Sequence, residues 1–182
     1  MGKRNLIVIG NGMAGIRTVE ELLALAPEKY AITVISSESV GAYNRIMLSP
    51  VLAGEKSFDD IVTHPAAWYA ERDITLLAGR TVTDIERAKR VAHLDDGTVL
   101  SYDRVLFATG SVPFIIPVPG HQHPDVVSFR DIQDVNRMVA ATTHKKRAAV
   151  LGGGLLGLEA ANGLLKQGME VTVIHDVEHL MN

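Results

Sequence analysis

The chain has 182 residues and a formal net charge of −3, from 18 basic and 21 acidic side chains. Its hydrophobic fraction of 47% and charged fraction of 21% are ordinary for a globular domain, so we expect no nucleic-acid partner and no membrane span. It contains no cysteine, which excludes a disulfide, a redox-active dithiol and a thiolate-ligated iron–sulfur cluster within this chain. The cytoplasm is the expected compartment.

The first predicted strand, 6–9, runs into a glycine-rich motif. The segment Ile9-Gly-Asn-Gly-Met-Ala-Gly15 has the pattern G-x-G-x-x-G before a helix predicted over 14–25. In this pattern one glycine permits a tight turn, one lets the backbone approach a pyrophosphate, and one lets the helix pack on the strand. The phosphates then lie at a helix N-terminus, where unpaired N–H groups and the helix dipole favour negative charge.

A second strand is predicted over 31–36, after Pro27 ends the helix, and it completes a β–α–β unit. Glu38 follows this strand. A carboxylate roughly 20 residues past the motif is the usual ligand of the ribose hydroxyls of a dinucleotide. A solvated loop glutamate is the alternative.

The middle of the chain predicts a loop over 41–54 and then a helical stretch that Pro65 interrupts. Trp68 and Tyr69 are expected to pack in the core. Four short β-like runs follow at 74–77, 81–85, 91–94 and 99–102. With Asp96-Gly97 as a hairpin turn, they predict a small antiparallel meander.

A buried strand predicted over 105–109 ends in Thr109-Gly-Ser111, where the backbone can lie against a ligand at the carboxyl edge of a sheet. A proline-rich stretch and a helix near 132–141 come next. The second motif, Gly152-Gly-Gly-Leu-Leu-Gly157, again joins an apolar run to a predicted helix, and a strand follows at 170–174. Two such motifs indicate two dinucleotide sites and electron transfer between two cofactors.

These motifs, in this order, resemble those of the FAD-dependent pyridine nucleotide reductases of the pyridine nucleotide-disulfide oxidoreductase type, such as rubredoxin reductases. They resemble in particular the N-terminal region of the large subunits of assimilatory NAD(P)H nitrite reductases. The matching segments are Ile9–Gly15, Tyr43-Asn-Arg45, Leu48-Ser-Pro50, Ala108-Thr-Gly-Ser111 and Gly152–Ala161.

The resemblance implies an α/β, Rossmann-like FAD/NAD(P)-binding fold, with a parallel sheet, an antiparallel β-meander and a truncated second Rossmann unit. Residues 1–115 would be the N-terminal portion of the FAD-binding domain, 116–145 a connector, and 146–182 the start of an incomplete NAD(P)H-binding domain. We therefore expect the chain to be part of a longer protein, and to form a homo-oligomer through unpaired strand edges beyond about 145.

The resemblance also assigns cofactor residues. Those for FAD are Gly10, Gly12, Met13, Ala14, Gly15, Glu38, Arg45, Ser49, Val82, Ala108, Thr109 and Gly110. Those for NADH or NADPH are Gly152, Gly154, Leu155, Leu156, Gly157, His175 and Asp176. An acid after the last strand suits the 2′-hydroxyl of NADH and a base suits the phosphate of NADPH, so His175 and Asp176 leave the choice open. Many relatives have a lysine after the serine, but Pro50 stands here, so no lysine role carries over.

Glu159 is the candidate catalytic residue. The resemblance points it toward the meeting place of flavin and nicotinamide. The alternative is an electrostatic role in the first turn of its helix. His121 and His123 form an H-x-H pair without further ligands, so no metal site is expected.

The function implied is transfer of a hydride from NAD(P)H to FAD and of electrons to a metal centre outside this chain. In the full-length protein a siroheme and an iron–sulfur cluster would then reduce nitrite to ammonia. Two alternatives stay open: a stand-alone rubredoxin- or ferredoxin-reductase-like flavoenzyme, and a non-catalytic nucleotide-binding module.

Overall fold

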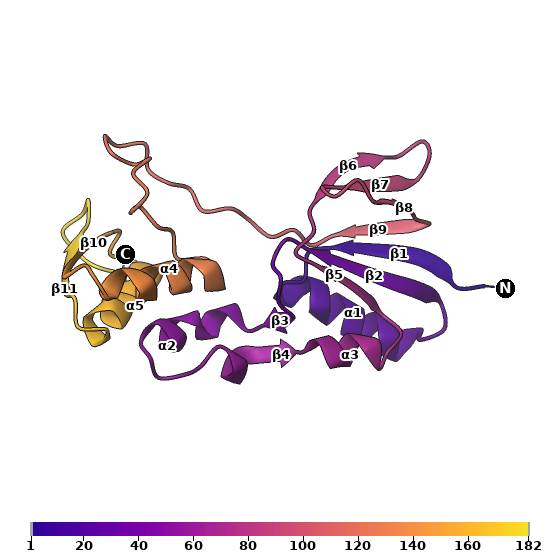
Figure 1. The fold of residues 1–182 in the computed structure, drawn as a ribbon, viewed down its shortest axis with the longest axis horizontal. Coiled ribbons are helices and arrows are strands. Elements are labelled where there is room, and N and C mark those ends of the chain that lie inside the picture. Colours follow the sequence, from indigo (N-terminus) through magenta and orange to yellow (C-terminus); the bar gives the residue numbers. More distant parts are fainter. Residues whose placement is uncertain (1, 182) are drawn as a thin grey trace. The chain divides into compact units, whose positions relative to one another are not determined.

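The computed structural model describes residues 2–181, which form two compact units (Figure 1). The first unit comprises residues 2–43 and 62–111, and the second comprises 44–61 and 112–181. The short strands β3 (Ala42–Tyr43) and β4 (Val62–His64) pair antiparallel where the chain leaves the first unit and returns to it. None of the helices among residues 2–181 is long and apolar enough to cross a membrane.

A four-stranded parallel sheet of order β5-β2-β1-β9 is the centre of the first unit. Its strands are β1 (Arg4–Ile9), β2 (Tyr30–Ser36), β5 (Thr75–Ala78) and β9 (Arg104–Phe107). Parallel strands covered on both faces are continuous apolar runs, and β1 has this character because its last four residues are all buried.

The two faces of the sheet have separate cores. Leu6 and Val8 pack on one face with residues of α1 (Met13–Leu25) and α3 (Ala66–Ala70). Ile7 and Ile9 pack on the other face with an antiparallel sheet of β6 (Val82–Glu86), β7 (Val91–Leu94) and β8 (Val99–Ser101). The meander is thus present, and it forms the second cover of the parallel sheet.

Trp68 and Tyr69 pack in the α1 core, as predicted. The run predicted over 74–77 was wrongly assigned to the meander. It forms β5, which pairs parallel with β2 as the edge strand of the main sheet. A short apolar run predicts a strand but not the partner of that strand, which explains the error. The predicted strand over 105–109 ends earlier, at Phe107, and Ala108-Thr-Gly110 is irregular.

The second unit contains α4 (Ile132–Thr142), β10 (Arg147–Leu151), α5 (Leu155–Lys166) and β11 (Glu170–Ile174). β10 and β11 pair parallel and form one β–α–β unit around α5, as the sequence predicts.

Segment 44–61 was expected within the first domain, but it packs in the second unit. The predicted loop over 41–54 contains a 3₁₀ turn and α2 (Leu48–Leu52). The helical stretch predicted after it contains a second 3₁₀ turn, Asp59–Ile61, and then β4. The Leu52 side chain lies so close to Gly163 of α5 that a Cβ built there would be 2.7 Å from Leu52 Cγ. Gln167 Nε2 also donates to the Leu52 carbonyl over 2.8 Å. Close packing on a glycine of α5 therefore holds α2 in the second unit.

Candidate dinucleotide-binding sites

The two glycine-rich loops have the same backbone geometry. Gly10 and Gly152 both adopt positive φ, of 107° and 112°. Gly12 and Gly154 both precede the first residue of their helix, with φ and ψ of −78° and 178° in one and −77° and 177° in the other. The N–H of Gly10 donates to the Ile35 carbonyl over 2.8 Å, and the N–H of Gly152 donates to that of Ile174 over the same distance. The repeat in sequence is thus a repeat in structure.

The space around the glycines assigns their roles. A Cβ at Gly15 would lie 2.5 Å from the Gly10 carbonyl oxygen, and one at Gly157 would lie 2.0 Å from that of Gly152. These glycines therefore allow each helix to pack on its loop. A Cβ at Gly12 or Gly154 would have no atom within 4 Å. The middle glycine of each motif faces open space, which is what a pyrophosphate approaching the backbone requires.

Both helices begin in a way that suits an anion. Neither α1 nor α5 has a side-chain cap or an acidic residue in its first turn. The first N–H groups of a helix have no partner within the helix and carry the positive end of its dipole. The predicted residues there are exposed: Met13 by 44%, Leu155 by 61% and Leu156 by 54%, and Ala14 is exposed as well. The site geometry thus fits a dinucleotide at each loop.

The predicted turn after β9 lies against the first loop. A Cβ at Gly10 would be 2.2 Å from the Ala108 carbonyl oxygen, so Ala108 and the Gly10 loop are in contact. Thr109 and Gly110 follow, and Gly110 has a φ of 71°. A Cβ at Gly152 would have no atom within 4 Å. Among the described residues β10 pairs with β11 alone, so no second neighbouring strand places a turn against Gly152 as β9 does against Gly10.

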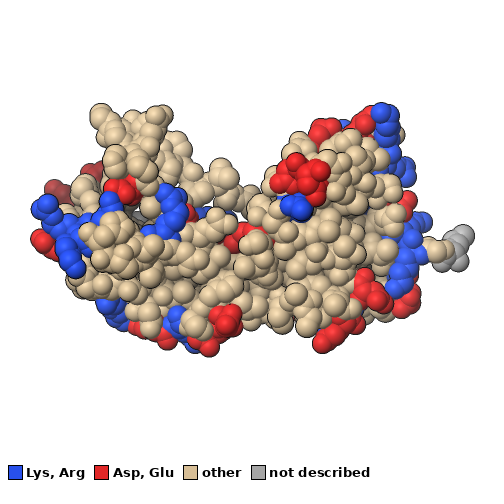
Figure 2. Space-filling model, in the orientation of Figure 1, with Lys and Arg blue, Asp and Glu red and all other residues tan. Residues whose placement is uncertain are grey.

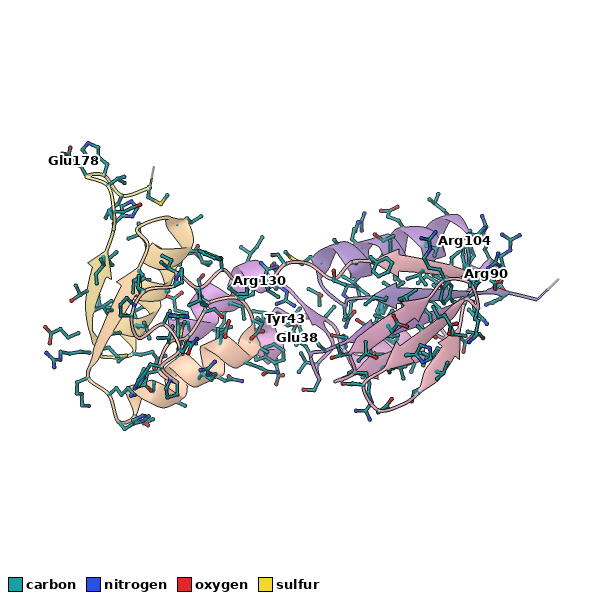
Figure 3. All side chains as sticks on the ribbon, turned by 90° about the horizontal axis from the view of Figure 1, so that it is seen from above. Glu38, Tyr43, Arg90, Arg104, Arg130 and Glu178 are labelled. Atoms are coloured by element: carbon teal, nitrogen blue, oxygen red, sulfur yellow. The ribbon has the colours of Figure 1, made fainter. Side chains whose placement is uncertain are left out.

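The proposed ribose ligand, Glu38, lies just beyond the carboxyl end of β2, the neighbour of β1. Its carboxylate accepts a hydrogen bond from the Tyr43 hydroxyl over 2.6 Å (Figure 3). Val82, a predicted FAD residue, begins β6, pairs with Leu94 and packs against the Ile7 core.

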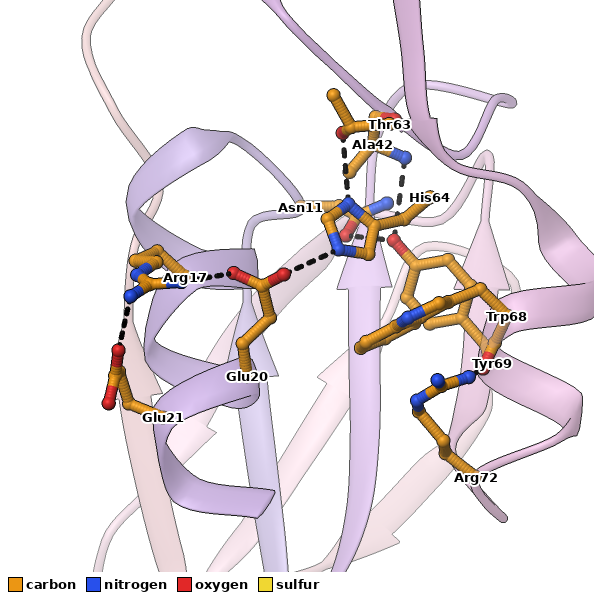
Figure 4. A network of polar contacts seen from close by, with 10 residues as sticks. All are labelled: Asn11, Arg17, Glu20, Glu21, Ala42, Thr63, His64, Trp68, Tyr69 and Arg72. Carbon is orange, nitrogen blue, oxygen red and sulfur yellow. Dashed lines mark hydrogen bonds and ion pairs between the residues drawn. The ribbon is translucent and has the colours of Figure 1, made fainter. Parts of the chain in front are cut away.

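The sequence did not predict that Asn11 and Tyr69 hold the first glycine-rich loop in place. Tyr69 donates from its hydroxyl to Asn11 Oδ1 over 2.7 Å, and the N–H of Ala42 donates to the same hydroxyl over 3.4 Å (Figure 4). Asn11 Nδ2 is buried without a hydrogen-bond partner in the described part of the chain. A polar residue between the first two glycines of the motif was the available signal.

Two of the remaining predicted residues meet in the second unit. Ser49 Oγ donates to Glu159 Oε2 over 2.6 Å, which joins α2 to α5. Arg45 donates to the Arg130 carbonyl over 3.2 Å. Glu159 is the fifth residue of α5, so the prediction that it lies in the first turn was wrong. The alternative electrostatic role depended on that position and no longer applies.

His175, directly after the end of β11, contacts the second glycine-rich loop. The Gly153 N–H donates to His175 Nδ1 over 3.2 Å, and Asp176 Oδ1 lies 3.3 Å from the same nitrogen. His175 Nε2 is buried and has no hydrogen-bond partner among residues 2–181, whereas the Asp176 side chain is 91% exposed. Within the described chain no three His, Asp or Glu side chains are grouped to hold a metal ion.

Charge is distributed without a dominant patch on the face that Figure 2 draws. Basic and acidic side chains are interspersed over its described residues, and no continuous basic stripe is seen there.

The family model for pyridine nucleotide-disulphide oxidoreductases matches residues 4–182. The chain belongs to this family. Membership implies binding of FAD and NAD(P)H, and it agrees with the two loops described above.

The nitrite reductase [NAD(P)H] of Bacillus subtilis is 46% identical over 181 residues, which are 100% of this chain and 22% of that protein. The assimilatory nitrate reductase electron transfer subunit of the same organism is 45% identical over 100% of this chain and 24% of that protein. The chain thus spans about a quarter or less of the length of these relatives.

Solved structures confirm the fold. NADH:rubredoxin oxidoreductase from Clostridium acetobutylicum superimposes with a TM-score of 0.87 at 26% identity, over 98% of this chain and 46% of that one. This fold of the family is Rossmann-like, with a parallel sheet that carries the glycine loops at its carboxyl edge.

Proposed function

We propose that this chain is the cofactor-binding part of an oxidoreductase that takes a hydride from NAD(P)H onto FAD and delivers electrons to a metal centre outside the chain, for the reduction of nitrite to ammonia. The observation that supports it most is the duplicated loop, with open space at Gly12 and at Gly154. The identity of 46% over the whole chain to a nitrite reductase supports the physiological substrate. The siroheme and iron–sulfur cluster would belong to the rest of the full-length protein.

The first loop would hold FAD. The backbone N–H groups at Gly12, Met13, Ala14 and Gly15 would bind the pyrophosphate at the α1 N-terminus, because they carry the positive end of the helix dipole. Glu38 would accept hydrogen bonds from the adenosine ribose. When bound, the flavin supplies the exchange between two-electron and one-electron transfer. The backbone of Val82, Thr109 and Gly110 would complete this site.

The second loop would hold the nicotinamide nucleotide. The backbone N–H groups of Gly154, Leu155 and Leu156, at the N-terminus of α5, would bind the pyrophosphate. His175 and Asp176 follow β11, where the adenosine ribose is bound in this fold. His175 Nε2 would find its missing partner on the ribose. Gly152 and Gly157 allow the turn and the close packing of the helix.

Ser49 and Glu159 are proposed to act together. The Ser49 hydroxyl donates to the Glu159 carboxylate, and this bond fixes the rotamer of Glu159 on α5. Arg45, held by the Arg130 carbonyl, begins the same segment. In this proposal Glu159 positions the nicotinamide. This role needs a carboxylate that is held in place, but it needs no proton transfer by the protein.

A second candidate is a reductase for rubredoxin or ferredoxin. The ferredoxin–NAD(+) reductase subunit of the benzene 1,2-dioxygenase system of Pseudomonas putida is 34% identical over 97% of this chain and 43% of that protein. This identity is lower than that of the nitrite reductase relative, so the candidate takes second place.

Anaerobic spectroscopy of the full-length protein that carries this chain tests the proposal. NADH or NADPH should bleach the visible flavin absorbance, and nitrite should restore it. Restoration by oxidised rubredoxin or ferredoxin, but not by nitrite, would favour the second candidate. A purified protein that binds no flavin would overturn both.

A further inference from the structure

The carboxylate of Glu38 is held in place before any ligand arrives. The Tyr43 hydroxyl donates to Glu38 Oε2 over 2.6 Å, and Tyr43 itself is only 4% exposed. Figure 3 labels both side chains, and the two residues are five positions apart in the sequence. A hydrogen bond from a buried, neutral donor to an ionised carboxylate is a strong one.

The main chain of Glu38 is fixed as well. Its N–H donates to Ser36 Oγ over 3.2 Å, at the end of β2. Its carbonyl accepts from the N–H of Gly79 over 3.0 Å, just after β5. Two neighbouring strands of the parallel sheet thus set the backbone, and Tyr43 sets the end of the side chain.

Tyr43 has its own support in β3. It pairs with Val62 of β4. The preceding residue, Ala42, accepts a hydrogen bond at its carbonyl from Thr63 Oγ1 over 3.0 Å, and its N–H donates to the Tyr69 hydroxyl. Because β3 is anchored on both sides, the Tyr43 hydroxyl has a defined position. A glutamate held by such a donor has lost its rotamer freedom before binding, so the ligand does not have to order it.

We propose that Tyr43 is a positioning residue for ribose recognition: its hydroxyl holds the Glu38 carboxylate in the rotamer that meets the hydroxyls of the adenosine ribose. The inference rests on the proposed function, which assigns Glu38 to the ribose of FAD. Tyr43 does not touch the ligand in this account. Its effect on the ribose is transmitted through Glu38, and this distinguishes it from a residue that merely supports the fold.

Flavin binding by the full-length apoprotein that carries this chain, followed by quenching of flavin fluorescence, tests the proposal. The ligands are FAD and an FAD analogue with 2′,3′-dideoxyadenosine, which lacks both ribose hydroxyls. Tyr43→Phe should weaken FAD roughly tenfold, the scale of one lost hydrogen bond to a charged group, and should leave the affinity for the analogue unchanged. Tyr30→Phe, a partly buried tyrosine of the α1 core, is the matched control and should change neither affinity.

A double-mutant cycle gives a second readout. In a Glu38→Ala background, Tyr43→Phe should have no further effect on FAD, because the side chain through which Tyr43 acts is absent. Equal weakening of FAD and the analogue by Tyr43→Phe would show a structural role and overturn the proposal. If the wild-type full-length protein binds both ligands equally, Glu38 is not the ribose ligand. If it binds neither, the proposed function fails.

Discussion

The hydroxyl of Tyr69 donates to the side-chain oxygen of Asn11 over 2.7 Å, across 58 positions of sequence. Asn11 is 8% exposed and lies between two glycines of the first loop, and Tyr69 is 1% exposed in α3. Burial raises the pKa of the Tyr69 hydroxyl, so it is a neutral donor throughout the physiological range. One buried hydrogen bond therefore joins the first glycine-rich loop to the core.

Removing this bond should lower stability. Tyr69→Phe would keep the ring in the core but leave the Asn11 oxygen buried without its donor. The free energy of unfolding, measured by urea titration, should fall by about 1–3 kcal/mol. Tyr30→Phe serves as the control, and its free energy of unfolding should fall by less. Equal losses in the two variants would show that the Tyr69–Asn11 bond has no special weight.

The first two glycines of the first motif should respond differently to substitution. Gly12→Val should abolish FAD binding with little change in stability, because its Cβ enters open space at an ordinary φ of −78°. Gly10→Val should also destabilise the fold, by about 1–3 kcal/mol or more, because φ is 107° and the Cβ would lie 2.2 Å from the Ala108 oxygen. Flavin fluorescence and urea titration measure the two effects. FAD binding at wild-type affinity by Gly12→Val would show that this loop is not the flavin site.

The second loop provides the same contrast. Gly154→Val should prevent binding of NADH and NADPH but leave FAD binding intact, because no atom lies within 4 Å of the added Cβ. Gly157→Ala should instead loosen α5, since its Cβ would lie 2.0 Å from the Gly152 oxygen. Calorimetric titration of NADH and circular dichroism would separate these outcomes. Loss of FAD but not NADH in Gly154→Val would reverse the assignment of the two loops.

The Glu20 carboxylate should make stability depend on pH. A hydrogen bond with His64 Nε2, 3.0 Å away, is the main cause that lowers the pKa of Glu20, and Arg17 adds to it (Figure 4). A carboxylate whose pKa is lowered on folding stabilises the fold above its unfolded pKa, and this contribution is lost as the pH falls through the lowered value.

Glu20→Gln removes this titration. Wild type should therefore be more stable than Glu20→Gln at about pH 6, and the difference should shrink toward about pH 3. Urea titration at several pH values measures it. Glu28→Gln is the control, because the Glu28 side chain is 86% exposed. A difference that stays constant with pH would contradict the role of Glu20.

The edges of the β10–β11 sheet should promote self-association. Every residue of both strands is exposed or only partly buried, and among the described residues the two strands pair only with each other. Leu151 and Ile174 are 54% and 53% exposed. Unpaired strand edges with apolar side chains recruit further strands, so the chain of residues 1–182 should dimerise at micromolar concentration. Light scattering should give at least twice the monomer mass, and Leu151→Lys should lower it. A monomer in wild type would contradict this expectation.

The sequence by itself determined the two loops, the first β–α–β unit and the place of Glu38. These depend on local rules: a positive φ at Gly10, close packing at Gly15, and a fixed spacing from the motif to the next strand end. Glycine is needed wherever a Cβ would collide or fill ligand space, so such positions can be recognised without knowing the rest of the fold.

Only the tertiary structure decided which distant segments meet. It paired β5 with β2 and packed segment 44–61 on α5. It also joined Tyr69 to Asn11 and Ser49 to Glu159, which lie 58 and 110 positions apart. Strand partners and hydrogen bonds between remote side chains depend on where whole elements pack. The periodicity of a local segment does not predict this packing.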